Sequence, residues 1–309
     1  MKKYAIIIGI RGLVLTEEEK RYLNANPPLG IILFSRNIKD KLQVKALIKS
    51  IKSILGRNSL ILIDQEGGKV SRLNAAEWPQ FPSSEYFGKI ALKNLNLAEK
   101  KTYENYKLIG NSLNEIGVNF NCAPCIDVRF NKTSQIIGSR SFSHDSRIIT
   151  ALAFQACKGL QKSNVTPILK HIPGHGRANE DSHIKLPEID NSINSLREKD
   201  FYPFKKLNKF PAVMTAHIKY LAIDKDNLAT HSSIVISEII RKYIGFKGVI
   251  FSDDICMKAL KGNYFFRSKK AIDAGCNIIL KCDHNLVTSF NASVGAGKVK
   301  KDLLKILYK

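Results

Sequence analysis

Fourteen residues near the middle of the chain hold an unusual concentration of groups that can transfer protons. They include one lysine, three histidines and a carboxylate, within Lys170-His171-Ile172-Pro173-Gly174-His175-Gly176 and Asp181-Ser182-His183. The first of these segments follows Val165–Leu169, a short apolar run, so its polar groups emerge where a buried strand ends and a loop begins. Catalytic groups commonly lie in such loops. The two segments are therefore the first candidates for the chemistry of this protein.

Asp181 and His183 form a carboxylate–imidazole pair two residues apart. In an extended loop, residues i and i+2 lie on the same side, so the carboxylate can hold one imidazole tautomer while the other ring nitrogen transfers protons. Such a pair resembles two thirds of a serine-hydrolase triad, but the chain has no Gly-x-Ser-x-Gly elbow to supply a nucleophilic serine. The pair is a candidate general acid/base.

A divalent metal is the main competing chemistry for this cluster. The ligands would be three histidines and one of two carboxylates, namely His171, His175 and His183 with Asp181 or Asp64. Lys170 would place a positive charge beside the cation, and the helical H-E-x-x-H pattern is absent. In the alternative without metal, His175 holds an irregular loop whose shape depends on Pro173 and the neighbouring glycines. Both interpretations stay open on these residues alone.

Asp253 and Asp254 follow Gly248–Phe251, another apolar run. Neighbouring residues of a strand point to opposite faces, so one of the two carboxylates should point into a pocket at the strand end. A carboxylate held there could stabilise positive charge, attack an electron-poor carbon or bind metal. We expect the other to cap the N-terminus of a following helix.

The segment Asp64-Gln65-Glu66-Gly67-Gly68 turns after a third apolar run, and its glycines permit positive φ. A carboxylate in this position is suited to bidentate hydrogen bonding with neighbouring sugar hydroxyls. Arg72 and Arg140 offer planar donor forks for a hydroxyl, carboxylate or amide oxygen. Either arginine could equally be an ion-pair partner at the rim of the site.

Eight short apolar runs, spread over the whole chain, must position these groups. They are Tyr4–Ile8, Gly30–Phe34, Leu60–Ile63, Val118–Cys122, Pro167–Leu169, Ala212–Thr215, Val249–Phe251 and Asn277–Leu280. Several lack polar alternation, as expected of parallel strands that are covered on both faces. Helical patterns lie between many of them. Thr16 begins a capping-box signature, and Asp40 precedes a stretch whose apolar residues fall on one helical face, namely Val44, Leu47, Ile48, Ile51 and Ile54. We therefore predict a single (β/α)8 barrel over residues 1–309, in which the candidate residues meet at the carboxyl ends of the strands.

Composition excludes some classes of protein. The 309 residues carry a formal net charge of +22, but the charge comes mostly from lysines scattered along the chain, without a nucleic-acid-binding module. No apolar run approaches the length of a membrane span. The start of the chain mimics a signal peptide, yet Arg11 interrupts its apolar stretch. We expect a cytoplasmic protein that binds neither nucleic acid nor membranes, with a basic surface that can attract an anionic substrate.

Six cysteines are too few for a disulfide scaffold in a chain of this length. Cys122 and Cys125 form a C-x-x-C pair that Cys276 and Cys282 could in principle complete as a zinc site. The spacing of the second pair fits no common zinc module, so we prefer to interpret them as buried thiols at strand ends.

Five motifs, in order and spread over nearly the whole chain, resemble those of glycoside hydrolase family 3. They are Asp64-Gln65-Glu66-Gly67-Gly68, Ile137-Gly138-x-Arg140-Ser141-Phe142, Lys170-His171-x-Pro173-Gly174-His175-Gly176, Asp181-Ser182-His183 and Phe251-Ser252-Asp253-Asp254. Within that family the chain is similar to the single-domain bacterial β-N-acetylglucosaminidases of peptidoglycan recycling. Among its departures are Lys69, where the family usually has arginine, and the thiols of Cys122 and Cys125.

The resemblance implies a role for each candidate residue. Asp253 would be the nucleophile, and His183, oriented by Asp181, would be the acid/base of a retaining mechanism. Asp64, Arg72, Lys170 and His171 would hold sugar hydroxyls, Arg140 would lie near the N-acetyl group, and His175 would support its loop. The implied substrate is the terminal N-acetylglucosamine of GlcNAc–1,6-anhydro-MurNAc muropeptides. The implied enzyme is a monomer without cofactor or metal.

Overall fold

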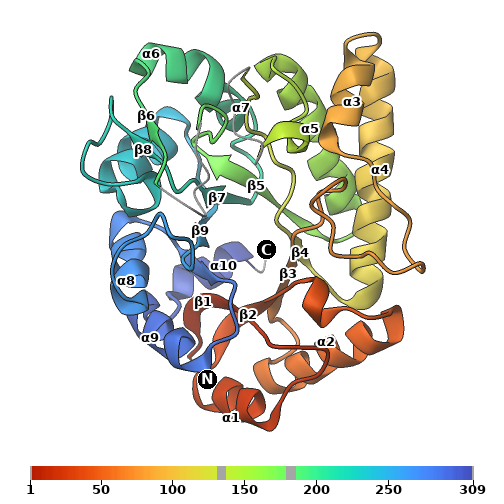
Figure 1. Ribbon diagram of the computed structural model, residues 1–309, viewed down its shortest axis with the longest axis vertical. Helices are drawn as coiled ribbons and strands as arrows, with labels where there is room; N and C mark the ends of the chain where they lie inside the picture. The colour runs from red at the N-terminus through yellow and green to blue at the C-terminus, as the bar shows by residue number, and fades with distance from the viewer. Residues whose placement is uncertain (1, 131–136, 179–185, 308–309) are drawn as a thin grey trace.

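The structure, a computed structural model, describes residues 2–130, 137–178 and 186–307. Its centre is a closed barrel of parallel strands in the order β1-β10-β9-β7-β5-β4-β3-β2 (Figure 1). The strands are β1 (Tyr4–Gly9), β2 (Pro28–Leu33), β3 (Leu60–Ile63), β4 (Phe120–Asn121), β5 (Thr166–Ile172), β7 (Ala212–Thr215), β9 (Val249–Asp254) and β10 (Ile278–Lys281). Each of the eight apolar runs overlaps one of these strands, which confirms the predicted α/β barrel.

Helices surround the barrel on its outer side (Figure 1). The α-helices are α1 (Glu17–Ala25), α2 (Lys41–Leu55), α3 (Ser84–Ala91), α4 (Leu95–Ile116), α5 (Ser146–Lys162), α6 (Ile193–Ser195), α7 (Phe201–Lys206), α8 (Tyr264–Ala274), α9 (Leu286–Ala296) and α10 (Lys301–Leu307). Shorter or wider helical turns are η1 (Ser35–Asn37), η2 (Gly138–Arg140), η3 (Leu196–Asp200), η4 (Ala229–His231) and η5 (Val235–Tyr243). Two further short strands, β6 (Glu188–Ile189) and β8 (Lys219–Tyr220), pair outside the barrel.

The structure confirms the capping box that the sequence predicted. The side chain of Thr16 accepts a hydrogen bond from the amide of Glu19, and the side chain of Glu19 accepts one from the amide of Thr16, so α1 begins with a capping box. Asp40 caps α2 by accepting from the amide of Gln43. The face that α2 buries ends at Leu55, although the spacing had favoured its neighbour Ile54.

The strands bury both of their faces, which explains why their sequences lack polar alternation. In β3, Leu60 and Leu62 belong to an apolar cluster that fills the barrel, whereas Ile61 and Ile63 belong to a second cluster that joins the barrel to its helices. Alternate residues of a strand point to opposite faces, so each short run contributes to both layers.

The two ends of the barrel differ. Near the amino ends of the strands, Val299 donates its amide to the carbonyl of Lys3, and α10 brings Leu303 into the cluster that fills the barrel. In Figure 1, α10 lies across the centre of the ring of strands. The opposite end, where the strands terminate, is the mouth that carries the candidate residues. Within the described ranges, we find no helix long and apolar enough to cross a membrane.

Candidate active site

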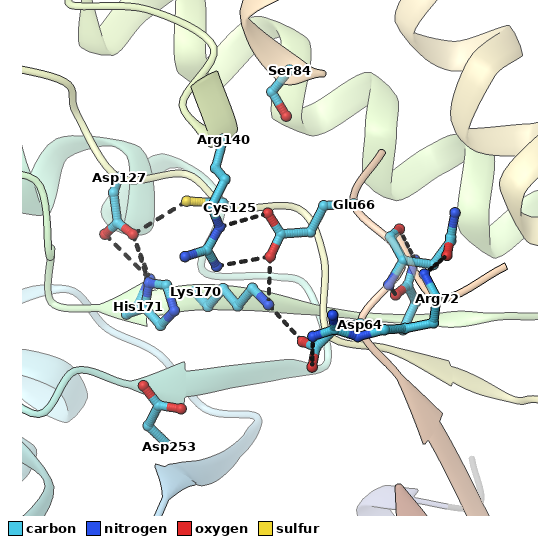
Figure 2. Close-up of polar contacts among 12 residues, drawn as sticks. Asp64, Glu66, Arg72, Ser84, Cys125, Asp127, Arg140, Lys170, His171 and Asp253 are labelled. Carbon is cyan, nitrogen blue, oxygen red and sulfur yellow. Dashed lines mark hydrogen bonds and ion pairs between the residues drawn. The ribbon is translucent and has the colours of Figure 1, made fainter. Parts of the chain in front are cut away.

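The carboxyl ends of β3, β5 and β9 bring together residues that are far apart in the sequence. Asp64 follows β3, Lys170 and His171 lie at the end of β5, and Asp253 lies at the end of β9. Figure 2 shows their side chains gathered at one place, with Arg140 and Asp127 above them. The structure thus places these predicted site residues in the mouth of the barrel.

Lys170 is the buried cation at the centre of the site. Its side chain is only 3% exposed, and its Nζ lies 2.8 Å from Oδ1 of Asp64 and 2.7 Å from Oε1 of Glu66. Burial alone would lower the pKa of Lys170, but the two carboxylates outweigh burial and raise the pKa above its ordinary value. Lys170 therefore keeps its charge, and Asp64 also lies 3.6 Å from a terminal nitrogen of Arg72.

Glu66 links Lys170 to Arg140. Nε of Arg140 donates to Oε2 of Glu66 at 2.9 Å, and a terminal nitrogen donates to Oε1 at 2.8 Å. Burial would raise the pKa of Glu66, but Arg140 and Lys170 hold it well below its ordinary value. Arg140 is thus an ion-pair partner whose side chain is 11% exposed. Glu66 was not among the predicted site residues, and its place in the Asp64–Gly68 motif was the one signal for it.

Asp127 organises the two described histidines of the first segment. Its Oδ2 lies 2.7 Å from Nδ1 of His171, and its Oδ1 accepts the backbone amide of His175 at 2.6 Å. Because the carboxylate only accepts, Nδ1 of His171 carries the proton of this bond. Burial would raise the pKa of Asp127, but His171 and the hydrogen bonds that Asp127 accepts lower it to about 2. Asp127 was not among the predicted site residues.

His175 is buried, and its ring lies edge-on to that of His171, with 5.3 Å between the ring centroids. Burial and the neighbouring His171 lower the pKa of His175 to about 4. At neutral pH it is therefore an uncharged part of the loop that follows β5.

Asp253 is 8% exposed, and Lys170, His171 and His217 lie near enough to influence its charge. Its Oδ1 accepts the backbone amide of Asp254 at 2.7 Å. Burial would raise the pKa of Asp253, but His171, His217, this amide and Lys170 lower it below its ordinary value. Asp253 is therefore an ionised carboxylate at neutral pH, as a nucleophile requires.

Asp254 is directed differently from Asp253. Its Oδ1 accepts the backbone amides of Cys256 and Cys282, both at 3.0 Å. The expectation that it caps a helix is wrong, because the next helix, α8, begins only at Tyr264. Asp254 instead joins the turn after β9 to the residue that follows β10. These two hydrogen bonds fix the backbone that carries Asp253.

His217 follows β7 and holds the same backbone. Its Nε2 lies 3.0 Å from the carbonyl oxygen of Asp254, so this nitrogen is the donor, and its Nδ1 lies 2.8 Å from Oγ1 of Thr230. Burial lowers the pKa of His217. The strand-end position of His217 was visible in the sequence, but its contact with the Asp254 carbonyl was not.

Asp181 and His183, the predicted acid/base pair, lie outside the described residues. Cys122, Cys125 and Cys276 are buried, as the sequence predicted for thiols at strand ends. Cys282 is partly exposed. All six cysteines are free, and they do not gather into the four-thiol zinc site that the C-x-x-C pair suggested.

Comparison with known proteins supports a family assignment. The family described as the glycosyl hydrolase family 3 N terminal domain matches residues 8–307. The beta-hexosaminidase of Glaesserella parasuis serovar 5 (strain SH0165) is 36% identical over 283 residues, which cover 90% of this chain and 80% of that protein.

Solved structures of NagZ from Neisseria gonorrhoeae share the fold. One, in complex with N-trifluoroacetyl-D-glucosamine, has a TM-score of 0.92 and 32% identity, covering 99% of this chain and 90% of that one. Another, in complex with a zinc ion, has a TM-score of 0.91 and 31% identity, covering 100% and 90%.

Replacing Glu66 by Gln should destabilise the protein by about 3 kcal/mol, because it removes the negative partner of two buried cations. The free energy of unfolding, measured by chemical denaturation, checks this. The control is Glu238→Gln, which breaks an exposed ion pair with Lys242 on η5 and should change stability little. Equal losses in the two variants would show that the buried network is not stabilising.

The pKa of His175 predicts a pH dependence of stability. Its folded-state pKa of about 4 lies below the ordinary value of 6.5, so its contribution is complete above pH 6.5 and is lost as pH falls towards 4. His175→Asn should reduce the slope of unfolding free energy against pH in this window, by up to about 1.4 kcal/mol per pH unit. Asp200, with a pKa raised by burial to about 6, titrates in both proteins and cancels in the difference. Parallel curves would refute the prediction.

Proposed function

The chain belongs to glycoside hydrolase family 3, and from that premise we propose that it is a retaining exo-β-N-acetylglucosaminidase. The observation that carries the proposal is the ionised Asp253, held at the mouth of the barrel beside Lys170 and His171. A relative named beta-hexosaminidase and a solved relative in complex with an N-acylated glucosamine support the choice of an amino sugar.

Asp253 is the nucleophile of the proposed mechanism. One of its carboxylate oxygens attacks the anomeric carbon of N-acetylglucosamine, and the bond from that carbon to the leaving oxygen breaks. The proton for the leaving oxygen comes from His183, which Asp181 orients. His183 then removes a proton from water, which attacks the same carbon and releases Asp253 with retained configuration. His183 is protonated when it donates and neutral when it takes the proton from water, and neither form is repelled by an ionised Asp253. Its ordinary pKa lies near neutrality, so both forms are accessible.

The sugar hydroxyls are proposed to bind Asp64, Arg72, Lys170 and His171. Asp64 is suited to this role because its carboxylate lies between two cations and is 17% exposed, so hydroxyl groups can still reach it. Asp127 holds the ring of His171, which fixes the direction in which the imidazole meets the substrate.

Arg140 is proposed to lie near the N-acetyl group, and His175 to support the loop after β5. Because Glu66 engages Nε and one terminal nitrogen of Arg140, the guanidinium has a fixed orientation. It can therefore provide a preorganised positive edge for the acetamide oxygen, at no further cost in side-chain ordering.

The proposed substrate is the GlcNAc–1,6-anhydro-MurNAc muropeptide of cell-wall recycling. A muropeptide carries carboxylates, and a formal charge of +22 on the protein favours the approach of such anions. A cytoplasmic monomer is part of the same proposal. The family match over residues 8–307 supports taking residues 1–309 as one catalytic domain.

Replacing Asp253 by Asn should reduce turnover of a chromogenic N-acetyl-β-D-glucosaminide by about 10⁴-fold or more, as expected when the nucleophile is lost. The matched control is Asp273→Asn, an exposed carboxylate on the outer helix α8, which should keep the wild-type rate. A chelator should leave wild-type turnover intact, whereas the competing metal-dependent hydrolase would lose its activity. Wild-type rates in Asp253→Asn would exclude the proposed mechanism.

A further inference from the structure

Cys125, Asp127 and His171 form a convergent group of metal-ligand atoms beside the catalytic mouth. Among residues 2–130, 137–178 and 186–307, it is the one group of three such side chains whose ligand atoms all lie within 4.8 Å of one another. Cys125 and Asp127 are fully buried, and His171 is 6% exposed. We propose that this group binds a thiophilic divalent cation, with Zn²⁺ as the best match, and that the bound ion inhibits the enzyme.

The donor set is the first support for the proposal. A thiolate, an imidazole and a carboxylate are all common zinc ligands, and three protein ligands leave a fourth position for water. Asp127 Oδ2 lies 2.7 Å from Nδ1 of His171 and 3.3 Å from Sγ of Cys125, as the dashed lines of Figure 2 show. Two proton donors thus converge on one carboxylate oxygen, at a place where a cation could replace their hydrogens.

The geometry needs only a small adjustment to hold the ion. Tetrahedral bonds of zinc to oxygen, nitrogen and sulfur place these ligand atoms about 3.3–3.5 Å apart. The sulfur–oxygen distance of 3.3 Å is already close to that, and the oxygen–nitrogen distance of 2.7 Å must widen by about 0.6 Å. A change of this size lies within the reach of side-chain rotation.

The backbone preforms the group, so binding does not require the chain to reorganise. Cys125 pairs with Lys170 as a parallel bridge, and Ile126 donates its amide to the Lys170 carbonyl at 2.9 Å. His171 donates its own amide to the carboxylate of Asp127, with 3.2 Å to each oxygen. The loop after β4 is thereby joined to the end of β5, which keeps the three ligand side chains together.

Binding exchanges one proton for the cation and involves no electron transfer. Burial and then Asp127 raise the pKa of the Cys125 thiol well above its ordinary value, so the thiol is protonated without metal. When the ion binds, the thiol proton leaves to solvent, and the proton that Nδ1 of His171 donates to Asp127 moves to Nε2, so that Nδ1 takes the metal. The site therefore gains one unit of positive charge.

Inhibition follows from that charge and rests on the proposed function. His171 already contributes to the lowered pKa of Asp253, so additional positive charge on its side should stabilise the carboxylate further and weaken it as a nucleophile. The ion also fixes the ring that is proposed to meet the sugar. We expect turnover at saturating Zn²⁺ to fall by about tenfold or more.

Co²⁺ titration of the chelator-treated protein tests the binding without reference to activity. A four-coordinate site with one thiolate should give a thiolate-to-cobalt charge-transfer band at one ion per chain, with release of one proton. The band should be absent from Cys125→Ser and from Cys125→Val, two variants that fill the buried position differently. It should persist in Cys157→Ser, which changes another fully buried thiol, on α5.

Zn²⁺ inhibition, measured against the metal-free rate of each variant, tests the consequence. The concentration of Zn²⁺ that halves turnover should rise by at least tenfold in both Cys125 variants and stay unchanged in Cys157→Ser. A missing band in the wild type, a band that survives in the Cys125 variants, or inhibition that survives in them would overturn the proposal. The cobalt result stands even if the protein hydrolyses no N-acetylglucosaminide, so the two proposals can fail separately.

Discussion

The ammonium group of Lys170, buried at the end of β5, determines how the mouth of the barrel is built. An unpaired buried charge would cost several kcal/mol, so the segments around it must supply carboxylates. Asp64 and Glu66 do so from the loop after β3, and Glu66 in turn requires Arg140 from η2. Three segments that are distant in the chain are therefore held at fixed positions by one connected set of charges.

The glycines of the same loop make this pairing possible. Gly67 has a φ of +92°, and a Cβ atom there would lie 2.3 Å from the carbonyl oxygen of Pro82. Glycine is consequently the residue that allows the turn between Glu66 and Val70. The carbonyl of Val70 closes this turn by accepting the amides of Glu66 and Gly67. The Asp64–Gly68 motif, which first suggested a sugar-binding carboxylate, therefore also places two carboxylates next to Lys170.

The sequence allowed the barrel and the strand-end residues to be predicted, because short apolar runs and their polar ends are local patterns. It did not reveal Glu66 or Asp127 as organising residues. Their roles depend on Arg140 and His171, which lie 74 and 44 positions away, and no spacing rule encodes such pairs. The cap expected at Asp254 failed for the same reason, since its partner Cys282 follows another strand, β10. The contact of Cys125 with Asp127 and His171 likewise depends on how β4 and β5 meet.

Covalent trapping with a slow fluorinated N-acetylglucosamine derivative tests directly whether Asp253 is the nucleophile. The lowered pKa of Asp253 and the fixed amide of Asp254 leave one ionised carboxylate oriented to attack. Mass spectrometry of the trapped, digested protein should find one sugar per chain, attached to Asp253, and no label in Asp253→Asn. A label on Asp254 or Asp64, or turnover of the derivative without any covalent adduct, would show that Asp253 is not the nucleophile.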